Sequence, residues 1–311
     1  MKIFLLRRIL KYSAFFTKPL DKKLNQKYAK NKCDLPIIFI IGAPRTGSTL
    51  LYQIISSLFK VTYLNNLVYS GREIPFLSYL LSHRIYAQKG HYSFSSVYGN
   101  TMKSGLNAPS EAGNLWRRWM PKDKFYINES DVDQQSQQSF SNFVSAIINY
   151  SGLPLLIKNL YFSQRLRFLK STNLKPKFIY IKREPLYTAQ SIFMARQEKL
   201  SDINSWWSVE PYNYHDLKKL DVYNQIASQV YYIEKQIEND LRLFNENDIL
   251  VINYEDLSYK TEEIIENIKS FSGLNYRHNF SRKQSFNIQT RNKKKIDDFH
   301  FQHLKKALKN F

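Results

Sequence analysis

The sequence predicts an α/β domain built on a largely parallel sheet. Short runs of β-branched residues, typical of buried strands, alternate with segments whose apolar residues recur at the period of a helix. The first such strand passes through a glycine-containing turn straight into a helix, which is the unit that parallel sheets repeat. The chain shows no internal repeat and no Pro/Ser-rich linker, so we expect a single domain.

Each expected strand is short, apolar and continuous, as strands covered on both faces are. The expected strands lie at 36–41, 153–157, 177–181 and 249–253. Helices are expected wherever apolar residues recur three and four positions apart. They begin at 48 and 186, and otherwise span 74–82, 139–150, 162–169, 222–244 and 262–271. The stretch 201–220 is expected to form a loop, and the sequence after 275 is basic and weakly patterned.

Residues 1–34 form a basic segment, separate from the predicted domain at 35–311. Arg7, Arg8 and Lys11 interrupt its apolar residues before the hydrophobic region of a signal peptide is complete. We expect a helix that packs on the domain or frays, and a peripheral contact with an anionic membrane is a second interpretation of the same pattern. No apolar run reaches the length of about 18 residues that a membrane span requires.

Cys33 is the only cysteine of the chain. An internal disulfide is therefore excluded, which is typical of proteins in a reducing compartment. We expect a cytoplasmic protein, with peripheral attachment to a membrane as the open alternative.

The chain is strongly basic, because 46 Lys and Arg residues outnumber 26 Asp and Glu residues and give a formal net charge of +20. Such a charge attracts polyanions, so nucleic acid, anionic lipid, acidic glycans and phosphorylated small molecules all remain as partners. A Lys-rich composition explains the surface charge equally well, so charge alone selects none of them. The histidines and the cysteine lack the spacing of metal ligands, and we expect no metal site.

The turn after the first expected strand runs from Gly42 to Thr49. A glycine-containing loop that opens a helix points backbone N–H groups into a concavity, and the helix dipole adds positive potential there. Arg45 and the hydroxyls of Thr46, Ser48 and Thr49 supply further donors. The turn therefore predicts a site for a phosphate or a similar anion, the alternative being a turn that holds no ligand.

This turn departs from the loop of nucleotide hydrolases, which ends in Gly-Lys-Ser/Thr with the lysine on the β- and γ-phosphates. Here Gly47 is followed by Ser48, and the loss of that cation disfavours an ATPase or a kinase. The run from Pro44 to Thr49 instead resembles the 5′-phosphosulfate loop of sulfotransferases that use 3′-phosphoadenosine-5′-phosphosulfate (PAPS). The family pattern is Pro-Arg/Lys-Ser/Thr-Gly-Ser/Thr-Thr, and this chain has it in full.

A second motif lies at the end of the third expected strand. Arg183 closes that strand, Pro185 suits the first turn of a helix, and Ser191 follows about two turns later. The arrangement resembles the 3′-phosphate site of the same family, where the arginine and the serine hold the phosphate that distinguishes PAPS from ordinary adenylates. The pattern is weak alone, but the two motifs together, in the family's order and each between a strand and a helix, are much more specific.

The resemblance covers residues 36–290 and implies a P-loop-like three-layer sandwich with a helical insertion on the acceptor side at about 61–150. It implies PAPS as the donor and adenosine 3′,5′-bisphosphate as the product. By the same resemblance, residues 45–49 hold the 5′-phosphosulfate and Lys158 steadies the sulfuryl group or the bridging oxygen. Tyr254 would lie near the adenine, although a tyrosine that ends an ordinary strand is an equal explanation.

Basic residues late in the chain offer a further donor to the nucleotide, either from Ser281-Arg282-Lys283 or from Gln289-Thr290-Arg291. The lysines at 293–295 are expected to be a solvated tail. The tryptophans either pack in the core or form an aromatic platform for a sugar: Trp116, Trp119, Trp206 and Trp207.

Transfer to a hydroxyl needs a base that accepts the proton of the acceptor. The cytosolic branch of the family has a histidine where this chain has Leu160, so that base is missing. The resemblance to the tyrosyl-protein and bacterial carbohydrate enzymes implies a glutamate instead, Glu73 or Glu111, and we favour Glu73 because it follows the loop helix. A carboxylate that only starts a helix explains either residue as well, and His83 and His91 are outside alternatives.

The sequence thus predicts a sulfotransferase that moves a sulfuryl group from PAPS to a hydroxyl acceptor. Family analogy points to a small molecule or a glycan, such as a carbohydrate or a glycolipid, and not to nucleic acid. Two rival hypotheses are a P-loop-type small-molecule kinase and a non-enzymatic, basic nucleic-acid-binding protein. The latter predicts a steep salt dependence of binding, but it does not explain two phosphate motifs in order.

Overall fold

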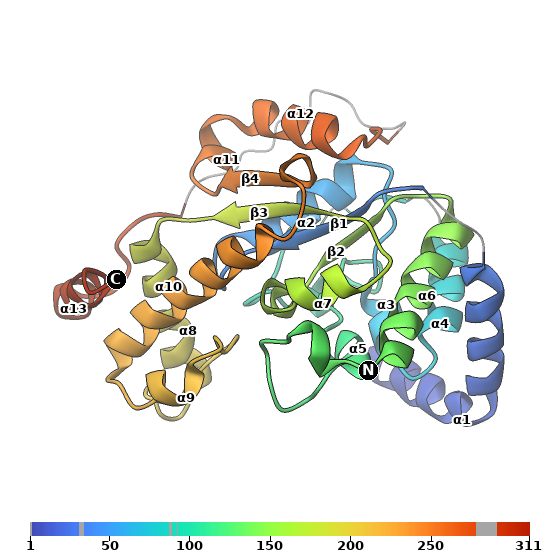
Figure 1. Ribbon diagram of the computed structural model, residues 1–311, viewed down its shortest axis with the longest axis horizontal. Coiled ribbons are helices and arrows are strands. Elements are labelled where there is room, and N and C mark those ends of the chain that lie inside the picture. Colours follow the sequence, from blue (N-terminus) through green and yellow to red (C-terminus); the bar gives the residue numbers. More distant parts are fainter. Residues whose placement is uncertain (1, 31–33, 87–88, 92, 278–290) are drawn as a thin grey trace.

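The computed structural model describes residues 2–30, 34–86, 89–91, 93–277 and 291–311. Within these residues a four-stranded parallel sheet has the order β2-β1-β3-β4 (Figure 1). The strands are β1 (Ile37–Ile41), β2 (Leu155–Lys158), β3 (Pro176–Lys182) and β4 (Ile249–Asn253). The predicted α/β fold with a central parallel sheet is confirmed, and each strand lies within two residues of its expected bounds.

The strand order fixes where a ligand site can form. From β1 the chain crosses to β2 on one side and then returns past β1 to β3 on the other side. The loops that leave the carboxyl ends of β1 and β3 therefore diverge, and in open α/β sheets ligands bind at this switch point.

Helices cover both faces of the sheet. On one face Ile37, Phe39 and Ile41 pack towards α6 (Gln134–Ser151), α7 (Leu166–Ser171) and α10 (Val222–Leu241). On the other face Ile38 and Ile40 pack towards α2 (Ser48–Leu58), α11 (Asp256–Tyr259) and α12 (Thr261–Ser272). The alternation along β1 gives the three layers, which are seen with α12 above the sheet and α7 below it in Figure 1.

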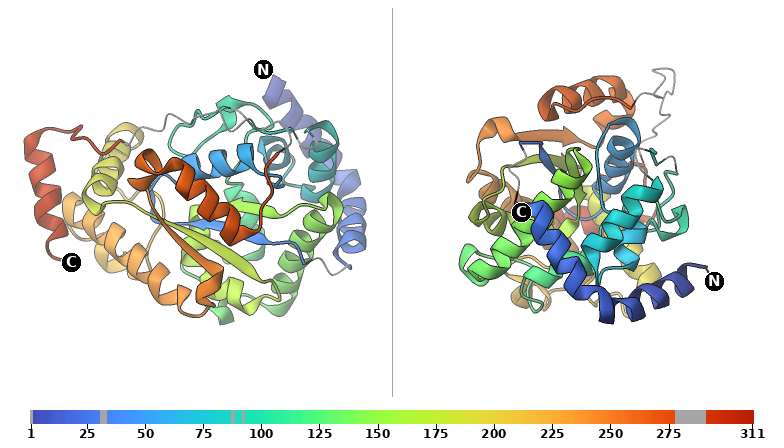
Figure 2. Two further views of the ribbon diagram at one scale, coloured as in Figure 1. Left: turned by 90° about the horizontal axis from the view of Figure 1, so that it is seen from above. Right: turned by 90° about the vertical axis from the view of Figure 1, so that its right-hand side faces the viewer.

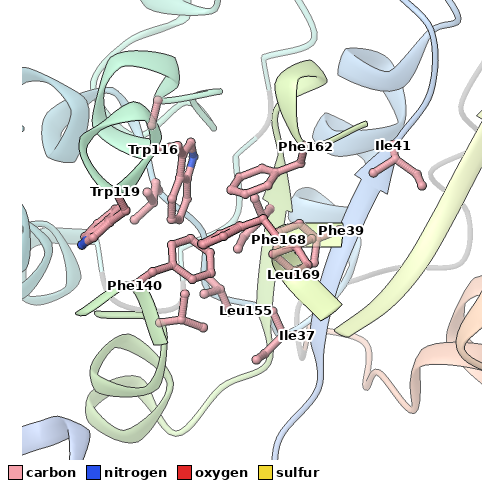
Figure 3. Packing of buried hydrophobic residues seen from close by; sticks show 14 of the residues in the cluster. Ile37, Phe39, Ile41, Trp116, Trp119, Phe140, Leu155, Phe162, Phe168 and Leu169 are labelled. Carbon is pink, nitrogen blue, oxygen red and sulfur yellow. The ribbon is translucent and has the colours of Figure 1, made fainter. Parts of the chain in front are cut away.

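An aromatic cluster fills the first of these two cores. The ring of Phe162 lies 5.1 Å from Phe39 of β1 and 5.5 Å from Trp116 (Figure 3). Trp119 packs against Phe140 of α6 at 5.6 Å in the same cluster. Two of the tryptophans considered as a sugar platform, Trp116 and Trp119, are therefore core residues, as edge-to-face aromatic pairs in a buried layer commonly are.

The remaining described elements are helices and 3₁₀ turns that lie between the strands or after the sheet, and some of them form a third hydrophobic cluster. The helices are α3 (Asn66–Ser70), α4 (Pro75–Tyr86), α5 (Gly113–Trp116), α8 (Pro185–Lys199), α9 (Tyr214–Leu217) and α13 (Asp298–Leu308). The 3₁₀ turns are η1 (Met102–Ser104), η2 (Arg117–Trp119), η3 (Glu129–Asp131), η4 (Leu160–Gln164) and η5 (Glu246–Asp248). Phe193, Ile226 and Leu304 join α8, α10 and α13 in a cluster of their own.

α13 is a helix that the sequence pattern did not predict. It is held at its start by Asp297, whose carboxylate accepts from the backbone N–H of His300 at 2.9 Å. Only Leu304 and Ala307 are buried among its residues. Two buried positions in three turns give little periodicity, which explains why the signal was missed.

The helix α1 (Lys2–Ala29) packs on α6, α4 and α3. The Asp21 carboxylate accepts from the backbone N–H of Leu77 at 2.7 Å, and the carbonyl of Tyr28 accepts from the Asn149 side chain at 2.7 Å. The expected helix that packs on the domain is thus present. It bends along its length (Figures 1 and 2), and Pro19 inside it is a sufficient cause. Among the described helices, none has the length and apolarity needed to cross a membrane.

Candidate active site

A cavity of about 1210 Å³ opens where the four strands end. Ser48 follows β1 and its loop, Lys158 ends β2, Arg183 follows β3 and Tyr254 follows β4, and all four line the cavity. The sheet therefore brings side chains from four distant parts of the sequence to one place, because parallel strands present their carboxyl ends at a single edge.

The loop between β1 and α2 forms one wall. Gly47 has a positive φ of 88°, and a Cβ at this position would overlap the ring of Tyr254. Glycine is therefore required both by the backbone conformation and by the close approach of the ring. Ser48 and Thr49 start α2 and line the cavity, so the free N–H groups of the first turn lie at this wall and favour an anion.

Thr46 takes a different position from that expected. Its side chain is buried, and its hydroxyl donates to the carbonyl of Ala43 at 2.9 Å. The hydroxyl thus closes the loop on itself and does not reach the cavity. Among the predicted loop donors, the side chains of Arg45, Ser48 and Thr49 line the cavity and that of Thr46 does not.

Two arginines meet at the switch point. Arg183 donates from Nη1 to the carbonyl of Arg45 at 2.8 Å, and Arg45 donates from Nε to the Ser191 hydroxyl at 3.0 Å. Burial lowers the pKa of Arg45, and the nearby charge of Arg183 lowers it further, although Tyr98 opposes this. Burial also lowers the pKa of Arg183. Two part-buried guanidinium groups side by side repel each other, and a bound anion would relieve that repulsion.

Tyr254 and the segment 291–295 complete the end of the cavity at which Arg45 and Arg183 lie. The guanidinium of Arg183 lies 4.6 Å from the ring centre of Tyr254, and the Tyr254 hydroxyl accepts from the backbone N–H of Arg291 at 3.3 Å. Arg291, Lys293 and Lys295 line the cavity. Lys293 and Lys295 are exposed, as expected of a solvated segment, yet they lie at the cavity, and Arg291 lies where a late donor was expected.

The other late donors considered, Ser281, Arg282, Lys283, Gln289 and Thr290, lie outside the described residues.

The second end of the cavity contains a buried ion pair. Lys158 is almost fully buried, with 1% of its side chain exposed, and it forms an ion pair with Glu111. Its Nζ also donates to the Thr49 hydroxyl at 3.1 Å. Burial lowers the pKa of Lys158, while the charge of Glu111 raises it. The side chain of Asn159 donates to the Glu111 carbonyl at 2.9 Å and so fixes the backbone that presents the carboxylate.

The structure separates the two glutamates that the sequence left open. Glu111 lines the cavity, and a Cβ on Gly99 would lie 2.6 Å from its Oε1, so the glycine leaves room for the carboxylate. Glu73 is not among the residues that line the cavity, and it forms an ion pair with Lys18 of α1 at 3.5 Å. The preference for Glu73 therefore has no geometric support, because a base must come within hydrogen-bond reach of the acceptor.

One wall of the cavity comes from segment 94–99. This segment lies within the insertion expected on the acceptor side, although none of its residues was singled out from the sequence. Tyr98 has a positive φ of 49°, and its ring lies 4.8 Å from the Arg45 guanidinium and 4.9 Å from the Lys199 ammonium. Its hydroxyl donates to Glu198. Tyr98 thus links the Arg45 end of the cavity to Glu198 and Lys199 of α8.

Of the remaining aromatic and histidine candidates, one lines the cavity and the others do not. Trp207 lines the cavity, whereas the indole N–H of Trp206 donates to the carbonyl of Val209 at 3.2 Å. His83 and His91 do not line it. In the described part of the chain, no group of three or more His, Cys, Asp and Glu side chains is arranged to hold a metal ion.

Comparison with known proteins identifies the family and supports the fold. The family model described as "Sulfotransferase family" matches residues 36–278. The sulfotransferase STF9 from Mycobacterium avium shares the fold, with a TM-score of 0.51 at 11% identity, over 91% of this chain and 70% of that chain. A search of curated proteins found no significant match.

Two further solved structures align less closely. The sulfotransferase domain from the curacin biosynthetic pathway has a TM-score of 0.44 at 19% identity, over 78% of this chain and 76% of that one. The sulfotransferase from Alicyclobacillus acidocaldarius has a TM-score of 0.44 at 11% identity, over 89% and 93%. Since the family model spans well over half of the sequence, the chain belongs to the sulfotransferase family and is an enzyme of sulfuryl transfer.

Proposed function

We propose that this sulfotransferase uses PAPS as its donor, as the family generally does, and transfers the sulfuryl group to a hydroxyl acceptor. One observation carries the proposal: a single cavity holds two arginines beside a helix N-terminus at one end and the Lys158–Glu111 pair at the other. The first end suits a doubly phosphorylated nucleotide. The second end suits a proton transfer beside a developing anion.

The donor is proposed to bind along the loop and the switch point. The N–H groups at the start of α2, with Ser48 and Thr49, would hold the 5′-phosphosulfate. Arg183 and Ser191 would hold the 3′-phosphate. Arg45 would lie between the two groups, because it belongs to the loop before α2 and contacts both Arg183 and Ser191. The guanidinium groups are suited to this task because each can donate two parallel hydrogen bonds to a phosphate.

The transfer step is proposed to use Glu111 and Lys158. A bond forms between the acceptor oxygen and sulfur, the bond from sulfur to the 5′-phosphate oxygen breaks, and the proton of the acceptor passes to the Glu111 carboxylate. Lys158 would steady the charge on the transferring group, a role for which its cation is already buried and pointed at Thr49. Glu73, which is held outside the cavity lining by Lys18, is given no part in this step.

The acceptor is proposed to be a carbohydrate or glycolipid hydroxyl. Phe94, Tyr98, Tyr161 and Trp207 give the cavity aromatic surface beside polar Ser95, Ser96 and Ser208. Aromatic rings pack well against the apolar faces of sugar rings, and hydroxyl donors fix their orientation. This combination supports a sugar, and the hydroxyl that reacts would be the one that reaches Glu111.

The proposal is tested by calorimetric titration of the protein with adenosine 3′,5′-bisphosphate, ADP and AMP. We expect selective binding of the bisphosphate, and a loss of about tenfold to a hundredfold in its affinity in Arg183→Ala, because one charged hydrogen-bonding group is removed. The matched control is Arg242→Ala, which removes an exposed arginine that does not line the cavity. Equal binding of all three nucleotides would contradict PAPS as the donor of this sulfotransferase.

A further inference from the structure

The helix α1 exposes a row of large apolar side chains. Ile9, Tyr12, Phe16 and Leu20 recur at three- and four-residue steps and so share one face, with Phe15 beside them. The exposed fraction is 81% for Phe15 and for Phe16, and 73% for Tyr12. We name these five residues the outer face of α1. Such a group is notable because soluble surfaces rarely gather several large apolar side chains on one short stretch.

The opposite side of the same helix is packed on the domain. Leu10 and Ala14 are buried there, Asp21 caps α4 through Leu77, and Leu24 and Tyr28 join the main core. The helix is therefore held in place by one face while the outer face points away. The rings of Phe15 and Phe16 remain exposed and contact each other, with ring centres 5.1 Å apart.

Basic residues extend the row along the helix. Lys23 and Lys27 follow Phe16 and Leu20 at the same three- and four-residue spacing, and Lys22 lies next to them. All three lysines are exposed. An exposed row of apolar and aromatic side chains with exposed lysines close by suits the surface of an anionic bilayer, which attracts the lysines while it takes up the rings.

The charge on this face decides between its partners. A second copy of the chain would bring two sets of lysines together, which opposes a dimer through this face. A nucleic acid would bind the lysines but would leave Ile9, Phe16 and Leu20 in water. An anionic bilayer accepts both parts, because the rings enter the boundary between headgroups and acyl chains while the lysines meet lipid phosphates.

We propose that the outer face of α1 docks the enzyme on an anionic membrane surface, with Phe15 and Phe16 inserted at the headgroup level. The helix lies outside residues 36–278, the part matched by the family model. The proposal does not rest on the donor or on the acceptor. It concerns binding at the surface, and no described helix crosses the membrane.

The test is co-sedimentation of the full chain with vesicles of phosphatidylcholine, with and without one third phosphatidylserine. We expect binding only with phosphatidylserine, and release as salt is raised. The double variant Phe15→Ser/Phe16→Ser should bind at least about tenfold more weakly, because two rings no longer leave water. Lys23→Gln/Lys27→Gln should weaken binding by about fivefold for each lysine.

The matched control is Tyr259→Ser/Phe299→Ser, which removes two exposed aromatic rings far from α1 in the sequence. It should bind as the parent does, and thermal unfolding should show that all variants fold. Absence of binding by the parent, equal binding to uncharged vesicles, or unchanged binding by Phe15→Ser/Phe16→Ser would each overturn the proposal. A dimer in sedimentation velocity that Phe15→Ser/Phe16→Ser converts to a monomer would also overturn it, since a second copy would then cover the face. Nucleotide titration should be unaffected in every variant, which separates this proposal from that of the donor.

Discussion

The two ends of the cavity are built in different ways. One end, which is proposed to bind the nucleotide and is called the nucleotide end below, contains Arg45, Arg183 and Tyr254. Each of these residues follows a strand within four residues, so the sheet itself fixes their positions. At the other end, called the transfer end because the transfer is proposed to take place there, Glu111 and the neighbouring Gly99 come from the long connection between α2 and β2, and only Lys158 belongs to a strand. The difference teaches that a strand end positions a residue through local sequence, whereas a residue in a long connection depends on contacts with distant parts of the chain.

The largest expected effect concerns the transfer end. Glu111→Gln should lower turnover of PAPS with hydroxyl acceptors by about 10²–10⁴-fold, because the acceptor's proton loses its base. Affinity for adenosine 3′,5′-bisphosphate should stay within a few fold, since Glu111 belongs to the other end of the cavity. Steady-state rates and calorimetry measure the two quantities separately.

Glu73→Gln is the control for this prediction. It removes the same charge from a residue that pairs with Lys18 and does not line the cavity, and exposed pairs of this kind contribute little. Turnover should therefore be unchanged. The assignment fails if Glu73→Gln loses turnover and Glu111→Gln keeps it, and the comparison between the two ends would then need a different transfer residue.

A smaller effect is expected from the rigidity of the nucleotide end. Gly47→Ala should lower the free energy of unfolding by about 2–4 kcal/mol, because alanine is strained at positive φ and its Cβ would overlap the Tyr254 ring. Nucleotide affinity should fall as well, since the loop must shift to accommodate the methyl group. Urea unfolding and calorimetry provide the measurements.

Gly273→Ala separates strain from overlap. Gly273 also has a positive φ, of 67°, but a Cβ there meets no atom within 4 Å. Its substitution should cost only about 1–2 kcal/mol and should leave nucleotide affinity intact. Equal losses of stability in the two variants, with nucleotide binding retained in both, would show that the contact of Gly47 with Tyr254 is unimportant.

Sequence patterns predicted the four strands and the nucleotide end because both depend on short stretches. They favoured Glu73 over Glu111 only slightly, since both carboxylates precede helical segments and look alike in one dimension. The choice depends on the reach of Lys158 from β2 and on the space left by Gly99. Neither property is encoded near either glutamate.

The position of the exposed lysines of segment 291–295 beside the cavity was missed for a related reason. The side chain of Gln190 donates to the carbonyl of Lys293 at 2.9 Å and accepts from the backbone N–H of Lys295 at 2.8 Å. One amide on α8 thus holds a segment about a hundred residues away beside the cavity. A basic run without periodicity gives no sign of such a contact, so its local pattern predicted only a solvated tail.

The last expected effect concerns the stability of the fold and not the chemistry of the cavity. Burial raises the pKa of Glu234 on α10 to about 7, with Lys182 opposing and Glu238 adding to the shift. Its Oε1 is buried and has no hydrogen-bond partner among the described residues. Because the folded-state pKa lies above the ordinary value, the folded state binds the proton more tightly. The protonated Glu234 therefore contributes favourably to the free energy of unfolding. This contribution is complete below about pH 4.5 and is lost as the pH rises through about 7.

Glu234→Gln should remove that dependence, since a neutral amide has no charge to desolvate. At about pH 8 the variant should unfold at a free energy about 2 kcal/mol above that of the parent, and at about pH 5 the two should nearly coincide. This difference in stability is smaller than the whole change in the pKa of Glu234 would give, because the side chain is partly exposed and solvent screens its charge. Turnover at neutral pH should not change, because Glu234 does not line the cavity. A stability difference that stays constant with pH would mean that Glu234 does not titrate in this range. A loss of turnover would mean instead that Glu234 on α10 influences Glu111 at the transfer end of the cavity.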